Sequence, residues 1–565
     1  MLRFPTSILM ILLLASAGAG AETLLVDGRG SGDFSRIQDA INASEAGWKI
    51  IVMNGTYRES LVVDRSVTLR GDGKPVVSGS GSLDPLITIN ASGVVLDGFV
   101  LVAGAVGSSL AAVACDSAAV LSLSDGSRIV NNTISGSPGH GIFLLNSTGH
   151  LVADNQIHDN LLAGIRLYRV SDSQIKTSEV CRNAYGIFID SSQENWASTN
   201  EIWGNRGDGI TIEDSIGNEF TSNSIHNNTG DGLRISESKN NIIVSNRIAD
   251  SENSGIDIYR SHSIMIASNT IDRSAEMGIN VDSSDNNVVV QNTLRENDLN
   301  GIAIHGSQSN TVSKNSIKNN RESGVSLRHE SQHNLIMKND ISGNKRYGLV
   351  IDESSLNFVQ DNRIRNNGDG IIIRYARENF LVDNGIEDNI FGISLEFVDN
   401  AVVSKNNIIN STRDGIRLLH AGNCKITGND IQSSLADGVH LLKSSGTVVS
   451  DNVIEDSGEY GVQVLDHSDQ NLFMLNLIRD SSLGGVYIFD GEFNLVTSNA
   501  LIDNGKFNGR DNRGNRWSSN YYSDYEGVPL PGHTAVGADP YPIYGSRGAV
   551  TFDLKPFLTY HYWGM

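Results

Sequence analysis

Short apolar runs alternate along this chain with Ser, Asn and Gly at a regular interval. A glycine followed by an aliphatic residue recurs sixteen times from Gly141 to Gly485, and successive glycines lie 22 to 24 residues apart. The intervals also carry Asn-x-Ile or Asn-x-Leu, as at Asn223-Ser224-Ile225, and an earlier Asn before an aliphatic run, as at Asn241-Ile242-Ile243-Val244. A fixed period in this range indicates a solenoid in which each repeat forms one coil.

Within each interval the apolar positions fall into three short runs with a period of two. This period predicts strands, and no run is long enough or 3.6-periodic enough for a helix. Three short strands per coil predict an all-β right-handed parallel β-helix whose inward Ile, Leu and Val side chains stack into one core. We expect the Asn columns to form side-chain amide ladders at the corners. We expect the glycines to supply special backbone angles at the third bend.

The regular repeat does not extend to the ends of the chain. Residues 1–21 resemble a secretion signal, with Arg3 before an apolar centre and small residues before Glu22. An uncleaved membrane anchor is the alternative, which the short apolar run disfavours. A short helix carrying Phe34, Ile37, Ala40 and Ile41, with Asp33 and Ser35 as candidate caps, is expected to cover the first coil. The predicted divisions are 1–21 signal peptide, 22–50 N-terminal cap, 51–128 irregular first coils, 129–505 regular coils and 506–565 aromatic and Pro-rich C-terminal cap.

Composition narrows the range of partners. The formal net charge is −22, which disfavours nucleic acid and anionic membranes. The chain has three cysteines, and Cys181 and Cys424 are separated by about ten coils, roughly 50 Å, so they cannot form a disulfide with each other. The sequence contains no CxxC, no HExxH and no Met/His cluster, so no metal site is predicted. A Ca²⁺ cofactor is left open, although the sequence contains no motif that indicates one.

Candidate binding residues follow from the strand after each repeat glycine. The first and third residues after the glycine are aliphatic and face the core, so the second, fourth and fifth face outward or lie at the bend. These outward positions are rich in Arg, carboxylate and aromatic side chains, which together suit an oligosaccharide. The predicted substrate-binding residues are Arg166, Tyr168, Arg169, Arg234, Asp257, Tyr259, Arg260 and Arg328.

The same columns contain candidates for catalysis. Outward residues of one column lie about 5 Å apart on successive coils. Paired carboxylates at that distance suit a retaining glycosidase, and carboxylates two coils apart suit an inverting one. A His or Tyr beside a charged residue suits a lyase or epimerase instead. The candidates are Asp190, Glu213, Asp214, Glu237, Asp282 and His305. Without any function, adjacent opposite charges on a solvated sheet also give modest stabilisation.

Two resemblances to known families rest on specific segments. Asp27-Gly28, Gly55-Thr56-Tyr57-Arg58-Glu59 and Leu69-Arg70-Gly71 resemble the opening coils of pectin methylesterases, although the catalytic signatures of that family are absent. The Asn-rich coils and the tail motifs Asn520-Tyr521-Tyr522-Ser523-Asp524-Tyr525 and Ala538-Asp539-Pro540-Tyr541-Pro542-Ile543 resemble NosD-like proteins of the carbohydrate-binding and sugar-hydrolysis (CASH) β-helix group. This second resemblance implies the β-helix fold, a surface location and carbohydrate, and NosD itself implies a link to copper-enzyme maturation.

Three hypotheses remain open at this point. In the first, a secreted or cell-surface protein binds polysaccharide or a cell-envelope glycan along the outward columns, and whether it also processes the polysaccharide is left open. In the second, the chain is a non-catalytic structural or adhesion rod of the envelope. In the third, it is a polysaccharide lyase or epimerase, which needs Ca²⁺ or Arg/Lys to neutralise a uronate. No membrane span is expected after signal cleavage, and no oligomeric state is predicted.

Overall fold

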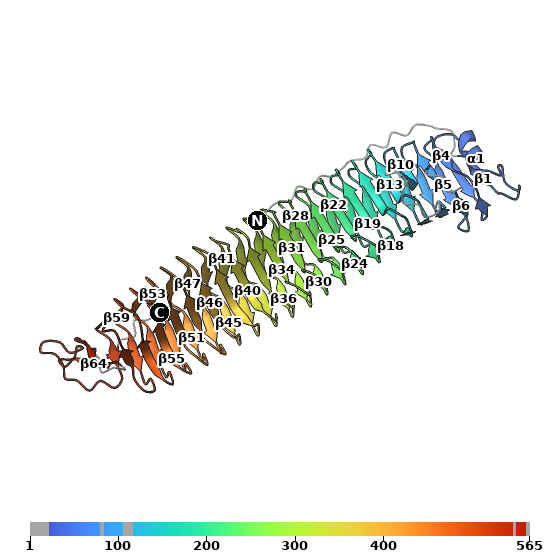
Figure 1. Cartoon of the computed structure of the whole chain (residues 1–565). Coiled ribbons are helices and arrows are strands. Elements are labelled where there is room, and N and C mark those ends of the chain that lie inside the picture. The colour runs from blue at the N-terminus through green and yellow to red at the C-terminus, as the bar shows by residue number, and fades with distance from the viewer. Residues whose placement is uncertain (1–21, 80–83, 105–116, 546–549, 561–565) are drawn as a thin grey trace.

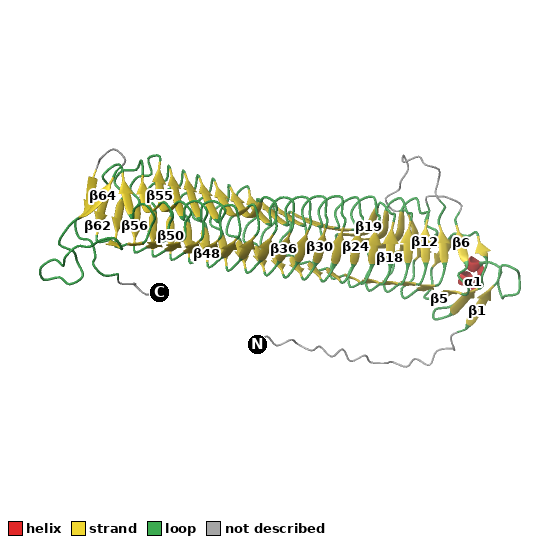
Figure 2. Cartoon of the chain, turned by 90° about the horizontal axis from the view of Figure 1, so that it is seen from below, coloured by secondary structure: helices red, strands yellow, loops and turns green. Residues whose placement is uncertain are grey.

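The chain folds into a long solenoid of three parallel sheets, shown in two views in Figures 1 and 2. The computed structural model describes residues 22–79, 84–104, 117–545 and 550–560. Sheet A has 22 strands from β1 (Thr23–Val26) to β62 (Arg516–Ser518). Sheet B extends from β3 (Thr56–Tyr57) to β63 (Tyr521–Tyr522), and sheet C from β4 (Leu61–Val63) to β65 (Val550–Asp553). The predicted right-handed parallel β-helix is therefore confirmed.

Successive coils stack in register, and this builds the core. In sheet C, β16 (Ala163–Tyr168) pairs in parallel with β19 (Tyr185–Asp190), so that Ile165 lies opposite Ile187 and Leu167 opposite Ile189. None of these four side chains is more than 1% exposed. Burying one such side chain stabilises the fold by about 1.5–3 kcal/mol. Because the same inward columns repeat along the rod, the core is continuous between the two caps.

Asparagine ladders fill the corners, as the sequence predicts. At the corner between sheets A and B, Asn223 Oδ1 accepts a hydrogen bond from the backbone N–H of Asn200 (3.0 Å) and another from its side-chain amide (3.0 Å). The side-chain amide of Asn200 also donates to the carbonyl of Ile175 (2.9 Å) in the preceding coil. Both asparagines are buried. Each Asn thus satisfies backbone groups that the bend leaves without a strand partner.

The repeat glycines have a different role from the one expected. They do not adopt left-handed backbone, which occurs instead at non-glycine residues after the sheet C strand, such as Glu237 (φ 49°) and Arg260 (φ 46°). A Cβ at Gly232 would lie 2.4 Å from Ile248 Cγ2 and 2.6 Å from the carbonyl oxygen of Gly255 in the next coil. The prediction of special backbone angles was wrong, because glycine is needed here for close approach of neighbouring coils.

The N-terminal end is covered by α1 (Ile37–Ala43), whose buried residues include Ile37 and Ile41. Its first two amides, from Ile37 and Gln38, donate to the carboxylate of Glu59 (2.9 and 3.1 Å). The predicted caps, Asp33 and Ser35, do not serve the helix: Asp33 accepts a hydrogen bond from the Leu25 amide. Phe34, which was placed in the helix, lies before it and forms a bridge with Val26. The capping group therefore comes from the first coil, 22 residues along the chain, which local sequence does not reveal.

The C-terminal end is covered by an antiparallel hairpin of β64 (Tyr541–Tyr544) and β65. Tyr541 stacks on the buried Tyr522 with ring centroids 3.7 Å apart. The carboxylate of Asp553 in β65 ends an Asn ladder by accepting the amides of Ser519 and Asn520 (both 2.9 Å). The expected aromatic C-terminal cap is thus present, while the domain boundaries given above stay predictions.

Three smaller expectations concern the membrane and the cysteines. No helix in the described ranges is long and apolar enough to span a membrane. Cys181 and Cys424 are buried and unpaired. The predicted signal, 1–21, and residues 105–116 with Cys115 lie outside the described residues.

Candidate functional site

The outer face of sheet C carries the columns expected to hold a ligand, and adjacent coils place them in register. Tyr168 lies opposite Asp190, and Asp190 opposite Glu213. Further along, Asp282 lies opposite His305, and His305 opposite Arg328. The predicted neighbours are therefore neighbours in the structure. Whether they bind or transform a ligand stays a prediction.

Several charged residues of these columns are already paired with one another. Arg166 contacts Asp190 (2.7 Å) and lies over the ring of Phe188, 4.5 Å from its centroid. Arg234 contacts Asp257 at 3.9 Å and Arg260 contacts Glu237 at 3.7 Å. Such pairing between coils stabilises the rod modestly.

The surroundings of several candidate residues shift their pKa values. Burial, together with the nearby carboxylate of Asp190, raises the pKa of Glu213. Burial also raises the pKa of Asp257 and lowers the pKa of His305. The remaining candidates lie beside these residues. Asp214 and Arg169 occupy left-handed turn positions, and the ring of Tyr259 lies under the guanidinium of Arg260.

The column at the second residue after the glycine is interrupted in the middle of the rod. Five consecutive strands carry small or apolar residues there, all 4% exposed or less: Ala303, Ser326, Val350, Ile372 and Ser394. The polar positions resume with Arg417 in β49 (Ile416–Leu419) and His440 in β52 (Val439–Leu442). The polar side chains of this column therefore fall into two groups, an N-terminal and a C-terminal polar region.

A further column, not identified from the sequence, lies immediately before the repeat glycines. Five of these glycines follow an aspartate: Asp208, Asp231, Asp369, Asp414 and Asp437. Four of the five are buried, and they lie on the same face as the second residue after the glycine. The recurring Asp-Gly pair was a visible signal, but an Asp-Gly pair also reads as an ordinary turn.

In the N-terminal region these carboxylates form a ladder with backbone amides. Asp208 Oδ1 accepts the amide of Asp231 (2.9 Å), and Asp231 Oδ1 accepts the amide of Ser254 (2.9 Å). The hydroxyl of Thr211 donates to the second oxygen of Asp208 (3.1 Å). Burial, reinforced by the neighbouring carboxylates of Asp257 and Asp208, raises the pKa of Asp231 to about 8. Near neutral pH this ladder therefore keeps a proton.

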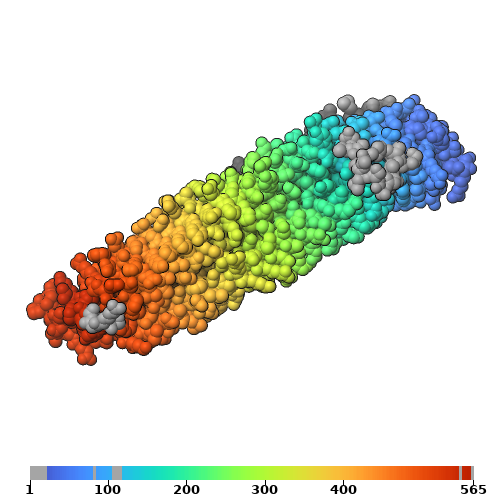
Figure 3. Space-filling model, in the orientation of Figure 1, coloured from blue at the N-terminus to red at the C-terminus, as the bar shows by residue number. Residues whose placement is uncertain are grey.

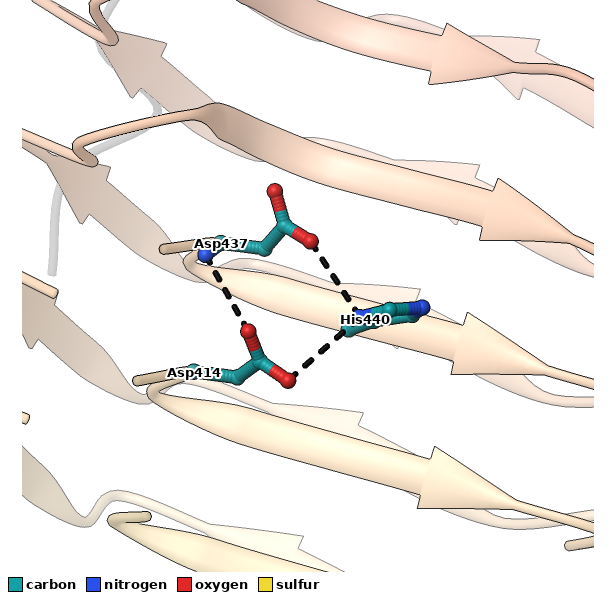
Figure 4. A group of neighbouring side chains, drawn as sticks. All are labelled: Asp414, Asp437 and His440. Atoms are coloured by element: carbon teal, nitrogen blue, oxygen red, sulfur yellow. Dashed lines mark hydrogen bonds and ion pairs between the residues drawn. The ribbon is translucent and has the colours of Figure 1, made fainter. Parts of the chain in front are cut away.

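In the C-terminal region the same ladder meets a histidine (Figure 4). The amide of Asp437 donates to Asp414 Oδ1 (3.2 Å), and the amide of Tyr460 donates to Asp437 Oδ1 (3.0 Å). The second oxygens of both carboxylates face His440 Nδ1, at 3.4 Å from Asp414 and 3.2 Å from Asp437. Burial alone would lower the pKa of His440, but the two carboxylates outweigh it and raise the pKa to about 9. His440 Nε2 is buried without a hydrogen-bond partner among the described residues.

This cluster borders a hollow of about 400 Å³, which we name the Asp–His pocket. Its lining combines apolar, cationic, acidic and amide side chains: Phe391, Arg413, Asp414, Arg417, Ala436, Asp437, His440, Leu442, Glu459 and Gln463. The guanidinium carbons of Arg413 and Arg417 lie 5.8 and 5.2 Å from the ring centroid of Phe391. Arg417 also contacts Glu396 at 3.9 Å. The pocket thus offers several hydrogen-bonding groups around an apolar wall.

Two other surface features are less suited to a ligand with many hydroxyls. Tyr375, Phe397 and His420 form an exposed aromatic stack with centroids 5.0 and 4.7 Å apart. Their faces cover one another, so only ring edges are available along the stack. A larger hollow of about 720 Å³ lies along sheet B beside the tail, with Leu477 and Phe557 among its apolar lining. The space-filling view shows an elongated rod with no single deep cleft on the face in view (Figure 3).

Comparison with known families gives two matches. Residues 118–271 and 254–396 match the family described as "Right handed beta helix region". Residues 345–527, which include the Asp–His pocket, match the family described as "Periplasmic copper-binding protein (NosD)".

A curated relative is similar over a short stretch. A cell surface glycoprotein of Methanothermus fervidus is 29% identical over 106 residues, which are 18% of this chain and 18% of that protein. The chain thus matches less than a fifth of the length of this relative.

Several solved structures are similar at low identity. A mutant of the periplasmic alginate epimerase AlgG is 16% identical, with 58% of this chain and 83% of that chain covered and a TM-score of 0.34. A DFA-IIIase from Arthrobacter chlorophenolicus is 13% identical, with 56% and 94% covered and a TM-score of 0.40. The tailspike protein 2 of an Escherichia coli O157:H7 bacteriophage is 16% identical, with 45% and 35% covered and a TM-score of 0.33. At these TM-scores the likeness carries no argument about this chain.

The residues of the Asp–His pocket do not fit Cu(I). The cluster of Asp414, Asp437 and His440 offers two carboxylates and one imidazole, and it is the one group of three potential metal ligands among the described residues. Cu(I) prefers thiolate and thioether ligands, which this set lacks, whereas Cu(II) accepts nitrogen and oxygen ligands. The chemistry of this donor set therefore argues against Cu(I) and does not single out Cu(II) among divalent ions.

Proposed function

Because this chain belongs to the NosD-like right-handed β-helix proteins, we propose that it is exported and binds polysaccharide at the outer face of sheet C. The matched family is described as periplasmic and the relative as a cell surface glycoprotein, and both descriptions support export. The observation that carries glycan binding is the Asp–His pocket, a hollow of about 400 Å³ in which an aromatic ring, two guanidinium groups, carboxylates and an amide converge.

The chemistry of the pocket suits one or two sugar units. The side chains of Phe391 and Leu442 line the pocket and provide apolar contacts for the C–H groups of a sugar ring. Glu459 and Gln463, at the next coil, provide acceptors and donors for hydroxyl groups, and Arg413 is an exposed donor at the rim. A small number of polar groups on a partly apolar wall is the usual composition of a binding pocket.

The N-terminal polar region is a weaker candidate for the same role. Arg166, Arg234 and Arg260 each contact a carboxylate of the chain itself, so a ligand would have to compete with these pairs. In the pocket, Arg417 contacts Glu396 at 3.9 Å, whereas Arg413 has no ion pair within 4.0 Å among the described residues. Binding is therefore expected to centre on the pocket, with the residues from Arg166 to Arg328 as an extension of the surface.

The test is a polysaccharide binding screen with the chain from Glu22, followed by titration against the polymer retained. We expect Arg413→Ala/Arg417→Ala to weaken binding by more than about tenfold. The matched control is Arg234→Ala/Arg260→Ala, which removes two arginines of the same face outside the pocket and should change binding by less than about threefold.

Two outcomes would contradict this proposal. If the control variant loses binding and the pocket variant does not, the ligand lies on the N-terminal columns. If the wild-type chain binds no polymer in the screen, the non-catalytic envelope rod becomes the better account.

A further inference from the structure

We propose that Asp414, Asp437 and His440 form a binding site for one divalent cation of the zinc or manganese class. This inference stands apart from glycan binding, because it concerns an ion held by the chain alone. It rests on the distances between the three side chains, on their burial and on the hollow beside them.

The distances are longer than charge-assisted hydrogen bonds and close to those between ligands of one metal ion. His440 Nδ1 lies 3.2 Å from Asp437 Oδ2 and 3.4 Å from Asp414 Oδ2. A charge-assisted N–H···O bond is about 2.7–2.9 Å long. Two ligand atoms that each lie 2.0–2.1 Å from a tetrahedral ion are about 3.3 Å apart. The three ligand atoms all lie within 4.8 Å of one another, so small side-chain adjustments bring them around one centre.

The two buried carboxylates also need more hydrogen bonds and more positive charge than His440 supplies. Asp414 and Asp437 are both buried, at 6% and 2% exposure. His440 Nδ1 carries at most one hydrogen, so it donates one full hydrogen bond and cannot satisfy both carboxylates. An uncompensated carboxylate is costly to bury. A divalent cation between the two oxygens would neutralise both carboxylates and bind the imidazole through its lone pair.

The two carboxylates are already oriented for this role. In each of them Oδ1 accepts a backbone amide of the next coil, from Asp437 and from Tyr460, which leaves Oδ2 directed at His440. Partners of this kind fix the orientation of metal ligands. The Asp–His pocket lies beside the three ligand atoms, so water or another ligand has room to occupy further coordination positions. Arg417 in the same pocket contacts Glu396, which offsets part of its positive charge.

A second pair of stacked aspartates in the chain has the same backbone contacts but no histidine beside it. Asp208 and Asp231 repeat the arrangement of Asp414 and Asp437, with the same bond from the second amide to the first carboxylate. The residues three positions after them are Thr211 and Arg234 in place of Arg417 and His440. Thr211 donates to the free oxygen of Asp208, so no pair of open oxygens faces an imidazole. Asp231 is thus a matched control on the same column.

The donor set defines the class of ion. Two carboxylate oxygens and one imidazole nitrogen are typical ligands of Zn²⁺ and are also suitable for Mn²⁺. Ca²⁺ takes 6–8 oxygen ligands and would find too few here.

The experiment measures metal binding by the intact chain. Chelator-treated protein is titrated with Zn²⁺ and, in parallel, with Mn²⁺, Ca²⁺ and Cu²⁺, and bound metal is counted by mass spectrometry after gel filtration. We expect one equivalent of Zn²⁺ or Mn²⁺ per chain. His440→Gln and Asp437→Asn should each weaken binding by more than about tenfold. Asp231→Asn should leave binding unchanged.

A second measurement needs no variant. Co²⁺ added to the wild-type chain should give visible absorption typical of a four-coordinate site, and Zn²⁺ should displace it. The proposal is overturned if the wild-type chain binds less than half an equivalent of every metal tested, or if Cu²⁺ alone binds. It is also overturned if folded His440→Gln and Asp437→Asn chains retain wild-type affinity, or if Asp231→Asn loses as much affinity as Asp437→Asn.

Discussion

Replacing Gly232 with alanine tests whether the repeat glycines are required by packing. The added Cβ would lie 2.4 Å from Ile248 Cγ2 and 2.6 Å from the Gly255 carbonyl oxygen. Ordinary contacts between such atoms are about 3.5–4.0 Å. The isoleucine can turn aside, but the carbonyl belongs to the next coil, which the sheet C hydrogen bonds hold in place. Overpacking of this kind costs about 1–3 kcal/mol, so we expect a loss near the upper end of that range.

Gly385 provides the matched control. It begins β45 (Gly385–Glu387) in sheet B, and a Cβ there would meet no atom within 4 Å. Its backbone lies outside the left-handed region. Gly385→Ala should therefore stabilise the fold by about 0.4–1 kcal/mol, because alanine restricts the unfolded chain.

Hydrogen exchange is the suitable assay, because long repeat arrays need not unfold in two states. The opening free energies of amides in β25 (Leu233–Ser236) and β28 (Ile256–Tyr259) should fall in Gly232→Ala, and amides far along the rod should change less. Gly232→Asn separates the two explanations, since Asn tolerates left-handed backbone better than Ala but is larger. If Asn is tolerated better than Ala at this position, backbone conformation is the requirement and the packing argument is refuted.

Two further predictions concern titration and the C-terminal cap. With a chelator present, resistance to urea should decrease as the pH rises through 9: the folded-state pKa of His440, about 9, lies above its usual 6.5, so the stability it contributes is complete below pH 6.5 and is lost as the pH passes 9. His440→Gln should reduce this decrease, and an identical pH profile in the variant would contradict the assignment. Asp553→Asn should weaken the last coil by about 1–3 kcal/mol, because an amide group replaces an acceptor of two backbone amides. Hydrogen exchange should accelerate in β62 and β63 but not in β25, and a uniform acceleration would count against a local cap.

The period of the sequence was enough to predict the fold because each coil repeats the same order of inward, corner and glycine positions. An inward Ile or Leu, a corner Asn and a glycine recur along the regular coils. The aliphatic side chains form the core and the asparagines form hydrogen-bonded ladders, as Ile165 and Asn200 illustrate. The glycine explanation failed for a physical reason. Close approach of Gly232 to Ile248 and Gly255 is a contact between coils, and no property of the local sequence displays it.

The site was harder to predict because it depends on which side chains share a face across the bend. Counting outward positions from the glycine correctly placed Asp282 beside His305 and Asp190 beside Glu213. It omitted the residue before the glycine, because only the positions after the glycine were counted. In the structure Asp437, one residue before its glycine, faces the same way as His440 and contacts it.

The two Asp ladders show how one repeated geometry acquires different chemistry. Stacking buried carboxylates on successive coils creates the same electrostatic problem at Asp208–Asp231 and at Asp414–Asp437. The first pair resolves it by retaining a proton, because the pKa of Asp231 is raised to about 8. The second pair faces an imidazole instead, and its free oxygens stay directed at His440 Nδ1. In a solenoid the coil fixes the spacing of the columns, so a change of two outward residues, from Thr211 and Arg234 to Arg417 and His440, distinguishes a structural ladder from a candidate site.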